Sequence, residues 1–208
     1  RNASEARFST FFHSIPVATA ITRLRDGSVI ETNSAWREYT GYSHEEVTGR
    51  PMDTLNLWIN PEKRKEFVEL MRTNGTVQGF EAQVKLHSGK ISDTLFSAEL
   101  IEVAGEPCIL SMALDITERK QSEELIKEQE RFIHATFDSL PEQICVIDEN
   151  YKIISTNQGW RRFAEQNGHP QDDFTGVNYL SVCKSAKGNS SENVNKIAEG
   201  LVAVMQGD

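Results

Sequence analysis

The sequence has few of the features that mark a disulfide-bonded, membrane-spanning or nucleic-acid-binding protein. Its three cysteines, Cys108, Cys145 and Cys183, include no CxxC pair and are odd in number, so a disulfide framework is not indicated. No apolar run approaches the ~18–20 residues that a membrane-spanning helix needs. Lys and Arg number 22 against 31 Asp and Glu, and the net charge of −9 argues against nucleic-acid binding and against docking on anionic lipid.

The remaining composition, 38% hydrophobic and 25% charged, is ordinary for a soluble globular protein. Cys108 and Cys145 lie in apolar runs, which is typical of buried, reduced thiols. We therefore expect a cytoplasmic location without direct membrane contact. The sequence begins at Arg1 with no signal-peptide pattern, and we expect it to be part of a longer protein.

Catalytic motifs are also missing from the sequence. It has no P-loop, no GxGxxG, no GxSxG elbow and no Gly-Gly-Asp-Glu-Phe run of the kind found in cyclases. The five histidines form neither an HxxxH nor an HExxH pattern, so no metal site is expected. His134 is followed by Ala135 rather than an acidic residue, which argues against a phosphoacceptor histidine. We expect no catalytic residues and no enzyme activity in this chain itself.

The most informative feature that the sequence does contain is an internal repeat. Residues 12–16 (Phe-His-Ser-Ile-Pro) return as residues 137–141 (Phe-Asp-Ser-Leu-Pro), and Trp36-Arg37 returns as Trp160-Arg161. The offset stays between 124 and 127 residues, which is hard to assign to chance. One unit of about 110–120 residues is therefore used twice, and the second copy lacks its last third.

Hydrophobic patterning predicts a mixed α+β domain in the first copy. Alternating apolar residues predict three long strands near residues 80–86, 94–100 and 108–114, each with one apolar face. Cys108, Leu110, Met112 and Leu114 are assigned to the apolar face of the last strand. The preceding elements are two strands (17–23, 28–32) and several helices (2–12, 33–39, a short one after Ser43 with a capping box to Glu46, and 61–72). Together they indicate α+β with an antiparallel sheet.

Three motifs in this order resemble the PAS family. They are Thr40-Gly41-Tyr42-Ser43-x-x-Glu46-x-x-Gly49, the turn His87-Ser88-Gly89-Lys90, and the closing run Asp115-Ile116-Thr117-Glu118-Arg119-Lys120. The resemblance implies a five-stranded antiparallel sheet with flanking short helices, followed by a linker helix and a second, truncated PAS unit. The expected domains are a complete PAS domain over 8–117, a signalling helix over 115–139, and two-thirds of a second PAS domain over 137–208. The second copy has Glu165–Pro170 where the first has Thr-Gly-Tyr.

The resemblance implies a bacterial sensory or dimerisation module that reports to a separate output domain, as in two-component histidine kinases and diguanylate cyclases. Two alternatives remain open. The first alternative is a ligand-free interaction module. The second is part of a histidine kinase or diguanylate cyclase whose catalytic domain is missing here.

A small-molecule cavity between the sheet and the short helices is the expected site. The candidate lining residues are Asn33, Trp36, Trp58, Phe80, Phe96 and Met112, of which Trp58 is favoured. The resemblance also bears on cofactors, whose identity stays open. The first copy has no cysteine near its short helices and no histidine on the helix from Pro61, so a covalent photochemical flavin and a His-ligated haem are both disfavoured. A non-covalent flavin is still allowed.

The segment between the copies predicts a helix with a short, imperfect heptad seam. Ile126, Ile133 and Leu140 repeat every seven residues, but Gln129 and Thr136 between them are polar. The functional interpretation is a homodimer through the PAS unit and this helix, and the alternative is a plain connecting helix. In the functional interpretation, Asp115, Thr117 and Arg119 relay the signal into the helix. The missing strands of the second copy predict an uncovered sheet edge.

Overall fold

The computed structural model describes residues 3–168, 174–185, 196, 199–201, 203 and 204. The chain forms two compact units, residues 1–124 and residues 125–208. Among the described residues, no helix combines the length and the apolar content that crossing a membrane requires.

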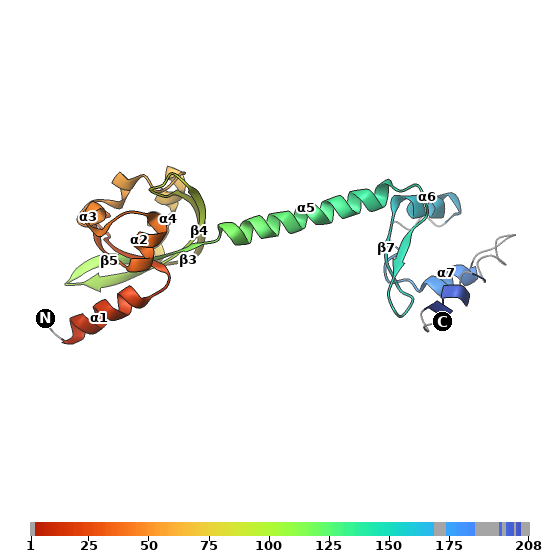
Figure 1. The fold of residues 1–208 in the computed structure, drawn as a ribbon, viewed down its shortest axis with the longest axis horizontal. Helices are drawn as coiled ribbons and strands as arrows, with labels where there is room; N and C mark the ends of the chain where they lie inside the picture. The colour runs from red at the N-terminus through yellow and green to blue at the C-terminus, as the bar shows by residue number, and fades with distance from the viewer. Residues whose placement is uncertain (1–2, 169–173, 186–195, 197–198, 202, 205–208) are drawn as a thin grey trace. The chain divides into compact units, whose positions relative to one another are not determined.

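The first unit is built on a five-stranded antiparallel sheet, as predicted (Figure 1). The strand order is β2-β1-β5-β4-β3. Its strands are β1 (Ala18–Arg23), β2 (Val29–Thr32), β3 (Thr76–Lys85), β4 (Ile91–Val103) and β5 (Glu106–Asp115). The three long strands follow one another through tight turns, and β5 returns to pair with β1 at the centre of the sheet.

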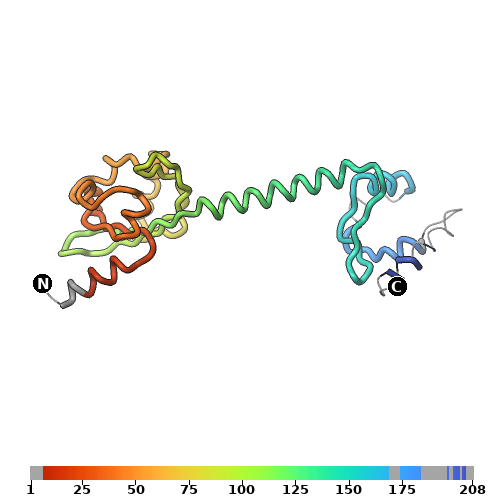
Figure 2. Tube along the Cα trace, viewed as in Figure 1, coloured from red at the N-terminus to blue at the C-terminus, as the bar shows by residue number. Residues whose placement is uncertain are grey.

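Short helices fill the connection between β2 and β3, which Figure 2 shows as the looped orange stretch of the chain. They are α2 (Ser34–Thr40), α3 (His44–Val47), the 3-10 helix η1 (Met52–Leu55) and α4 (Pro61–Asn74), while α1 (Ala3–Ser14) precedes the sheet. Local sequence explains their ends. Asn33 caps α2, the capping box of Ser43 and Glu46 forms at α3, and Asn60 with Pro61 starts α4.

The sheet is covered on both faces. On the inner face, helices α2 to α4 pack Trp36, Phe67 and Met71 against the strands. On the outer face, Phe12 of α1 packs with Ile21 and Cys108. Figure 1 shows α1 and α3 on opposite sides of β5 accordingly.

The prediction of which residues of β5 point toward the cavity and the helices is wrong. Ile109, Ser111 and Ala113 point to the inner face, whereas Leu110 joins the outer cluster around Phe12 and Met112 is 37% exposed. Both residue sets of this strand are largely apolar, so alternation alone does not say which of them faces the helices. Ile109, Ser111 and Ala113 line the cavity on the inner face together with Trp36 and Phe96.

The second unit contains a two-stranded antiparallel sheet of β6 (Cys145–Ile147) and β7 (Ile153–Thr156). Helix α6 (Gln158–Gln166) and helix α7 (Tyr179–Ser185) follow, and Ile153, Ala164 and Phe174 form the core. In the part of this unit that the structure describes, no third strand pairs with the sheet. Residues 169–173 and most of 186–208, which the second copy was predicted to include, lie outside the described residues.

Helix α5 (Thr117–Ser139) begins in the first unit and ends in the second. It starts at Thr117, two residues later than the predicted start at residue 115. Asp115 accepts a hydrogen bond from the backbone N–H of Thr117 at 2.9 Å. Leu125, Ile126, Phe132 and Ile133 are all more than half exposed.

Candidate functional site: a cavity in the first unit and its link to helix α5

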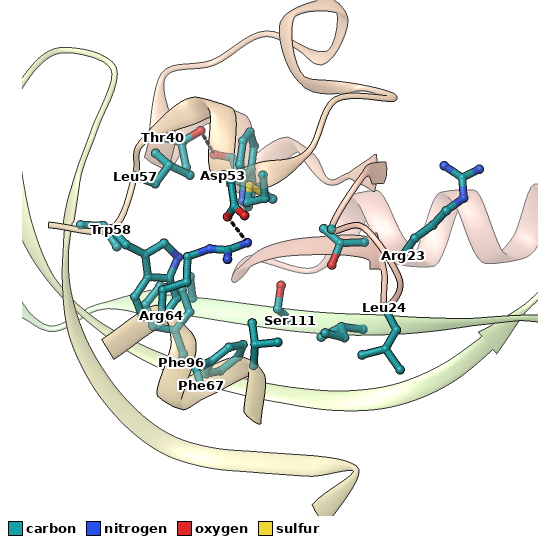
Figure 3. Close-up of a pocket in the computed structure, with 18 of the residues that line it drawn as sticks. Arg23, Leu24, Thr40, Asp53, Leu57, Trp58, Arg64, Phe67, Phe96 and Ser111 are labelled. Atoms are coloured by element: carbon teal, nitrogen blue, oxygen red, sulfur yellow. Dashed lines mark hydrogen bonds and ion pairs between the residues drawn. The ribbon is translucent and has the colours of Figure 1, made fainter. Parts of the chain in front are cut away.

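A cavity of about 240 Å³ lies in the first unit between the inner face of the sheet and helices α2, η1 and α4 (Figure 3). Strands β1 and β5 contribute small side chains such as Ala18, Ser111 and Ala113. Because these side chains are small, the space beneath the helices is left free. The Ser111 hydroxyl points into the cavity in Figure 3 and donates to the carbonyl of Ala20 at 3.3 Å.

One wall of the cavity is aromatic. The rings of Trp58 and Phe96 stack with centroids 4.6 Å apart, and Phe67 lies 5.6 Å from Trp58. Trp58 is held in place by its neighbours along the chain. Leu57 accepts a backbone hydrogen bond from Lys85, and Ile59 donates one to the carbonyl of Gln83. The irregular segment before α4 is therefore anchored to β3.

Charged side chains gather around the other part of the cavity. Arg64 of α4 forms an ion pair with Asp53 of η1, and Figure 3 shows both side chains meeting over the cavity. Arg23 points away, toward Glu106, whose carboxylate lies 2.9 Å from its guanidinium Nε. Arg72 also lines the cavity, and its side chain forms no ion pair or hydrogen bond with another described residue.

The structure brings half of the predicted lining residues to the cavity. Trp36, Trp58 and Phe96 line it. Phe80 lies behind this wall, 5.5 Å from the ring of Phe67 and opposite Phe96 in the β3–β4 register. The prediction that Met112 lines the cavity is wrong. Its neighbours Ser111 and Ala113 line the cavity, so Met112 faces away from it.

Asn33 does not line the cavity either. Both polar atoms of its side chain are hydrogen-bonded to backbone groups. Its Oδ1 accepts from the N–H groups of Thr19 at 2.9 Å and Trp36 at 2.8 Å. Its Nδ2 donates to the carbonyls of Ile15 and Val17. Asn33 is completely buried and joins β1, the segment before it and the start of α2.

A chain of hydroxyl groups runs from the cavity wall to the start of α5. Tyr39, which lines the cavity, donates to the Ser92 hydroxyl at 2.8 Å and lies 2.6 Å from the Thr94 hydroxyl. The Ser92 hydroxyl lies 3.2 Å from that of Thr117, the first residue of α5. Ser92 and Thr94 are fully buried, so these contacts are shielded from water. Tyr39, Ser92, Thr94 and Thr117 are called the hydroxyl chain below.

Two pKa shifts fit this arrangement. Burial raises the pKa of Tyr39, against the opposing effect of its hydrogen bonds to Ser92 and Thr94, so its hydroxyl keeps its proton. Partial burial also acts to raise the pKa of Asp115, but hydrogen bonds from Thr117 and Ser92 outweigh it and lower that pKa. Both groups are therefore held in the form that makes these hydrogen bonds at neutral pH.

Comparison with known proteins agrees with this geometry. The PAS fold family matches residues 6–116. The chain belongs to the PAS family. The match covers the sheet and the helices of the first unit, and PAS domains are in general sensory modules.

Two curated relatives are much longer than this chain. A 104.1 kDa protein of Rhodobacter capsulatus, encoded in the hypE 3′ region, is 34% identical over 80 residues, which are 37% of this chain and 8% of that protein. The methyl sulfide methyltransferase-associated sensor of Methanosarcina acetivorans is 28% identical over 123 residues, which are 58% of this chain and 12% of the sensor.

Among solved structures, an RNA-binding light-oxygen-voltage receptor is similar with a TM-score of 0.53 and 18% identity. The alignment covers 61% of this chain and 37% of the receptor, and at this identity it shows a shared fold alone.

The predicted relay residues of this PAS domain lie where its sheet meets α5. The Asp115 carboxylate accepts a hydrogen bond from the backbone N–H of Thr117. The Thr117 hydroxyl in turn accepts one from the backbone N–H of Asp93 at 3.0 Å. Arg119 lies 3.6 Å from both Glu81 and Glu123, in exposed contacts of the kind that contribute little. Lys120, which was not predicted, makes a shorter contact of 2.7 Å with Glu81 and ties α5 to β3.

Several other residues of the site had no signal in the sequence. Tyr39 meets Ser92 and Thr94 across 53 and 55 residues of chain, and no local pattern predicts such a contact. Asp53 and Arg64 are separated by the irregular segment that contains Trp58. The described residues that line the cavity include no histidine and no cysteine, so the wall offers neither an imidazole nor a thiol to a ligand.

Proposed function

We propose that this chain is a sensory module in which occupancy of the cavity is relayed through the hydroxyl chain to helix α5 and from there to an output domain outside this sequence. The observation that carries the proposal is the contact of one side chain, Tyr39, with both the cavity and the Ser92–Thr117 pair at the start of the helix. A ligand that moves Tyr39 changes the partners available to Ser92, and thereby the packing of the first turn of α5.

The far end of α5 is fixed in a similar way in the second unit. Asp138 accepts from the backbone N–H of Gln158 at 2.8 Å and from the guanidinium of Arg161 at 2.9 Å. The carbonyl of Phe137 accepts from Asn157. Each end of the helix is thus hydrogen-bonded within its own unit, which supports transmission along α5. We infer that the second unit is a partial PAS domain that receives this signal, in a cytoplasmic protein with reduced thiols.

Hydrogen–deuterium exchange tests the relay. In Tyr39→Phe we expect faster exchange of the backbone N–H groups in residues 117–124, because Ser92 loses its donor and its contact with Thr117 weakens. The matched control is Tyr42→Phe, whose hydroxyl makes a single 3.4 Å bond to Leu55 and has no contact with Ser92 or Thr94. If exchange in residues 117–124 is unchanged in Tyr39→Phe, or rises equally throughout β1 and β5, the proposed relay is wrong.

A second candidate function is homodimerisation through α5. Ile126 and Ile133 are 55% and 64% exposed and stand seven residues apart, the spacing of a coiled-coil seam. Roughly three heptads are marginal on their own, so the PAS unit must contribute to any dimer. Sedimentation of Ile126→Asn/Ile133→Asn against Lys127→Asn/His134→Asn tests this. Loss of the dimer in the first variant alone supports the seam, and a monomeric wild type excludes it.

A further inference from the structure

The charged residues that line the cavity indicate which kind of ligand it binds. Its lining includes four arginines and two aspartates, Arg23, Arg25, Arg64, Arg72, Asp26 and Asp53. Arg23 and Arg25 are both paired with Glu106, which does not line the cavity. Among the described residues that line the cavity, Arg64 and Arg72 are the cations that do not contact Glu106, and Arg64 is paired with Asp53.

The pair of Arg64 and Asp53 is easily exchanged. The Asp53 side chain is 62% exposed and the Arg64 side chain 23%. An ion pair in such a position contributes only ~0–1 kcal/mol, so a competing carboxylate faces a small cost in displacing Asp53. The released Asp53 side chain is then hydrated by the surrounding water. A planar guanidinium also fits a carboxylate through two parallel hydrogen bonds.

Arg72 lies two turns further along the same face of α4. Arg64, Val68 and Arg72 all line the cavity at intervals of four residues. At a rise of ~1.5 Å per residue the backbones of the two arginines are about 12 Å apart, so one anionic group contacts Arg64 while Arg72 adds to the positive potential.

The apolar part of the cavity fits a small flat body. Trp58 and Phe96 are stacked with an interplanar angle of 16°, and Phe67 lies beside them. The volume of about 240 Å³ is below the ~300–1,000 Å³ of pockets for drug-sized ligands. The cavity therefore suits a ligand of about one ring.

We propose that the cavity binds a small organic anion, with its flat apolar body against Trp58 and Phe96 and its carboxylate on Arg64 in place of Asp53. This inference rests on the proposed function, since it names the class of ligand that the sensory module takes. An amine would meet Arg64 and Arg72, and a neutral ring would leave the ion pair with Asp53 undisturbed.

Three probes of one size separate these possibilities: benzoate, its neutral isostere benzamide, and the cation benzylamine. Binding is followed by the indole N–H signals of the three tryptophans in NMR spectra of the whole chain. Trp36 and Trp58 line the cavity, whereas Trp160 belongs to the second unit and is an internal control. We expect benzoate to shift the signals of Trp36 and Trp58 and to leave the signal of Trp160 unchanged. The Kd of benzoate should be at least about fivefold below that of benzamide.

The charge variants give effects of opposite sign. Arg64→Gln weakens benzoate binding about tenfold, because a charge-assisted contact is lost. Asp53→Asn strengthens it about threefold, because Arg64 is released from its competitor. The control Lys65→Gln removes one positive charge from the same helix, where Lys65 pairs with Glu62 and does not line the cavity, and leaves the Kd unchanged.

The outcomes separate this inference from the function on which it rests. If benzamide or benzylamine binds as tightly as benzoate, or if Asp53→Asn fails to tighten binding, the anion preference is wrong while a sensory cavity stands. If no probe shifts the signal of Trp58, the cavity does not take such a ligand and the inference fails. An unchanged exchange pattern in residues 117–124 of Tyr39→Phe refutes the relay whatever the probes do.

Discussion

Asn33 and Asn157 make the same contacts in their two units. Asn33 accepts from the backbone N–H of Trp36 at 2.8 Å, and Asn157 accepts from that of Trp160 at 2.9 Å. Each also caps a helix that follows a strand, and each donates to carbonyls of the segment before the hairpin. The repeat in the sequence therefore has a physical basis, in a buried amide that joins three segments of backbone.

Replacing Asn33 with Ala should cost about 3 kcal/mol of the free energy of unfolding, because buried N–H and C=O groups lose their partner. The matched control is Asn60→Ala, which removes a helix cap at an exposed position and should cost about 1 kcal/mol. Urea denaturation of both variants measures the difference. Equal losses would show that burial of the Asn33 network adds nothing.

Gly41 ends α2 in the left-handed region, with φ of 81°. A Cβ at this position would lie 3.2 Å from the Cβ of His87, whereas at Gly89, with φ of 86°, it would meet no atom within 4 Å. Gly89→Ala should cost about 1 kcal/mol for the backbone conformation alone, and Gly41→Ala about 2 kcal/mol because the crowding is added. Thermal unfolding compares them, and the prediction fails if Gly89→Ala is the more destabilising change.

Much of the fold could be predicted because its signals are local. The capping box of Ser43 and Glu46, the Pro61 helix start and the strand alternation each involve residues within a few positions of one another. The face of β5 could not be predicted, because Ile109 and Leu110 are equally apolar and the choice depends on packing against α1 and α4.

The site was less predictable than the fold. The three aromatic candidates that line the cavity, Trp36, Trp58 and Phe96, were recognisable by size and position. Asn33 was predicted to line the cavity and does not, because its side-chain oxygen and nitrogen are hydrogen-bonded to the backbone. Tyr39 and Arg64 depend on partners that only the folded chain brings near.

The stability of the first unit should depend on pH through Asp115. Its pKa is lower in the folded chain than the ordinary 3.8, so its ionised form stabilises the fold above pH 3.8 and this stabilisation is lost as the pH falls through the lowered value. Asp115→Asn keeps an oxygen acceptor for Thr117 but has no charge to lose. Urea denaturation at pH 7, 5 and 3 should show wild type more stable than the variant at pH 7 and 5, with the gap closing at pH 3. A gap that is constant with pH contradicts this assignment.

The hydroxyl chain predicts energetic coupling between two residues that do not touch. Tyr39→Phe and Thr117→Val should each cost about 1–2 kcal/mol, because buried hydroxyl partners are left unsatisfied. Ser92 lies between them, bonded to Tyr39 at 2.8 Å and 3.2 Å from Thr117, so removal of either neighbour alters its bond to the other. The double variant should therefore depart from additivity by about 0.5–1 kcal/mol in a denaturation cycle. Tyr42→Phe combined with Thr117→Val should be additive, because Tyr42 shares no partner with Thr117. Additivity in both cycles would mean that Ser92 does not connect the cavity wall to α5.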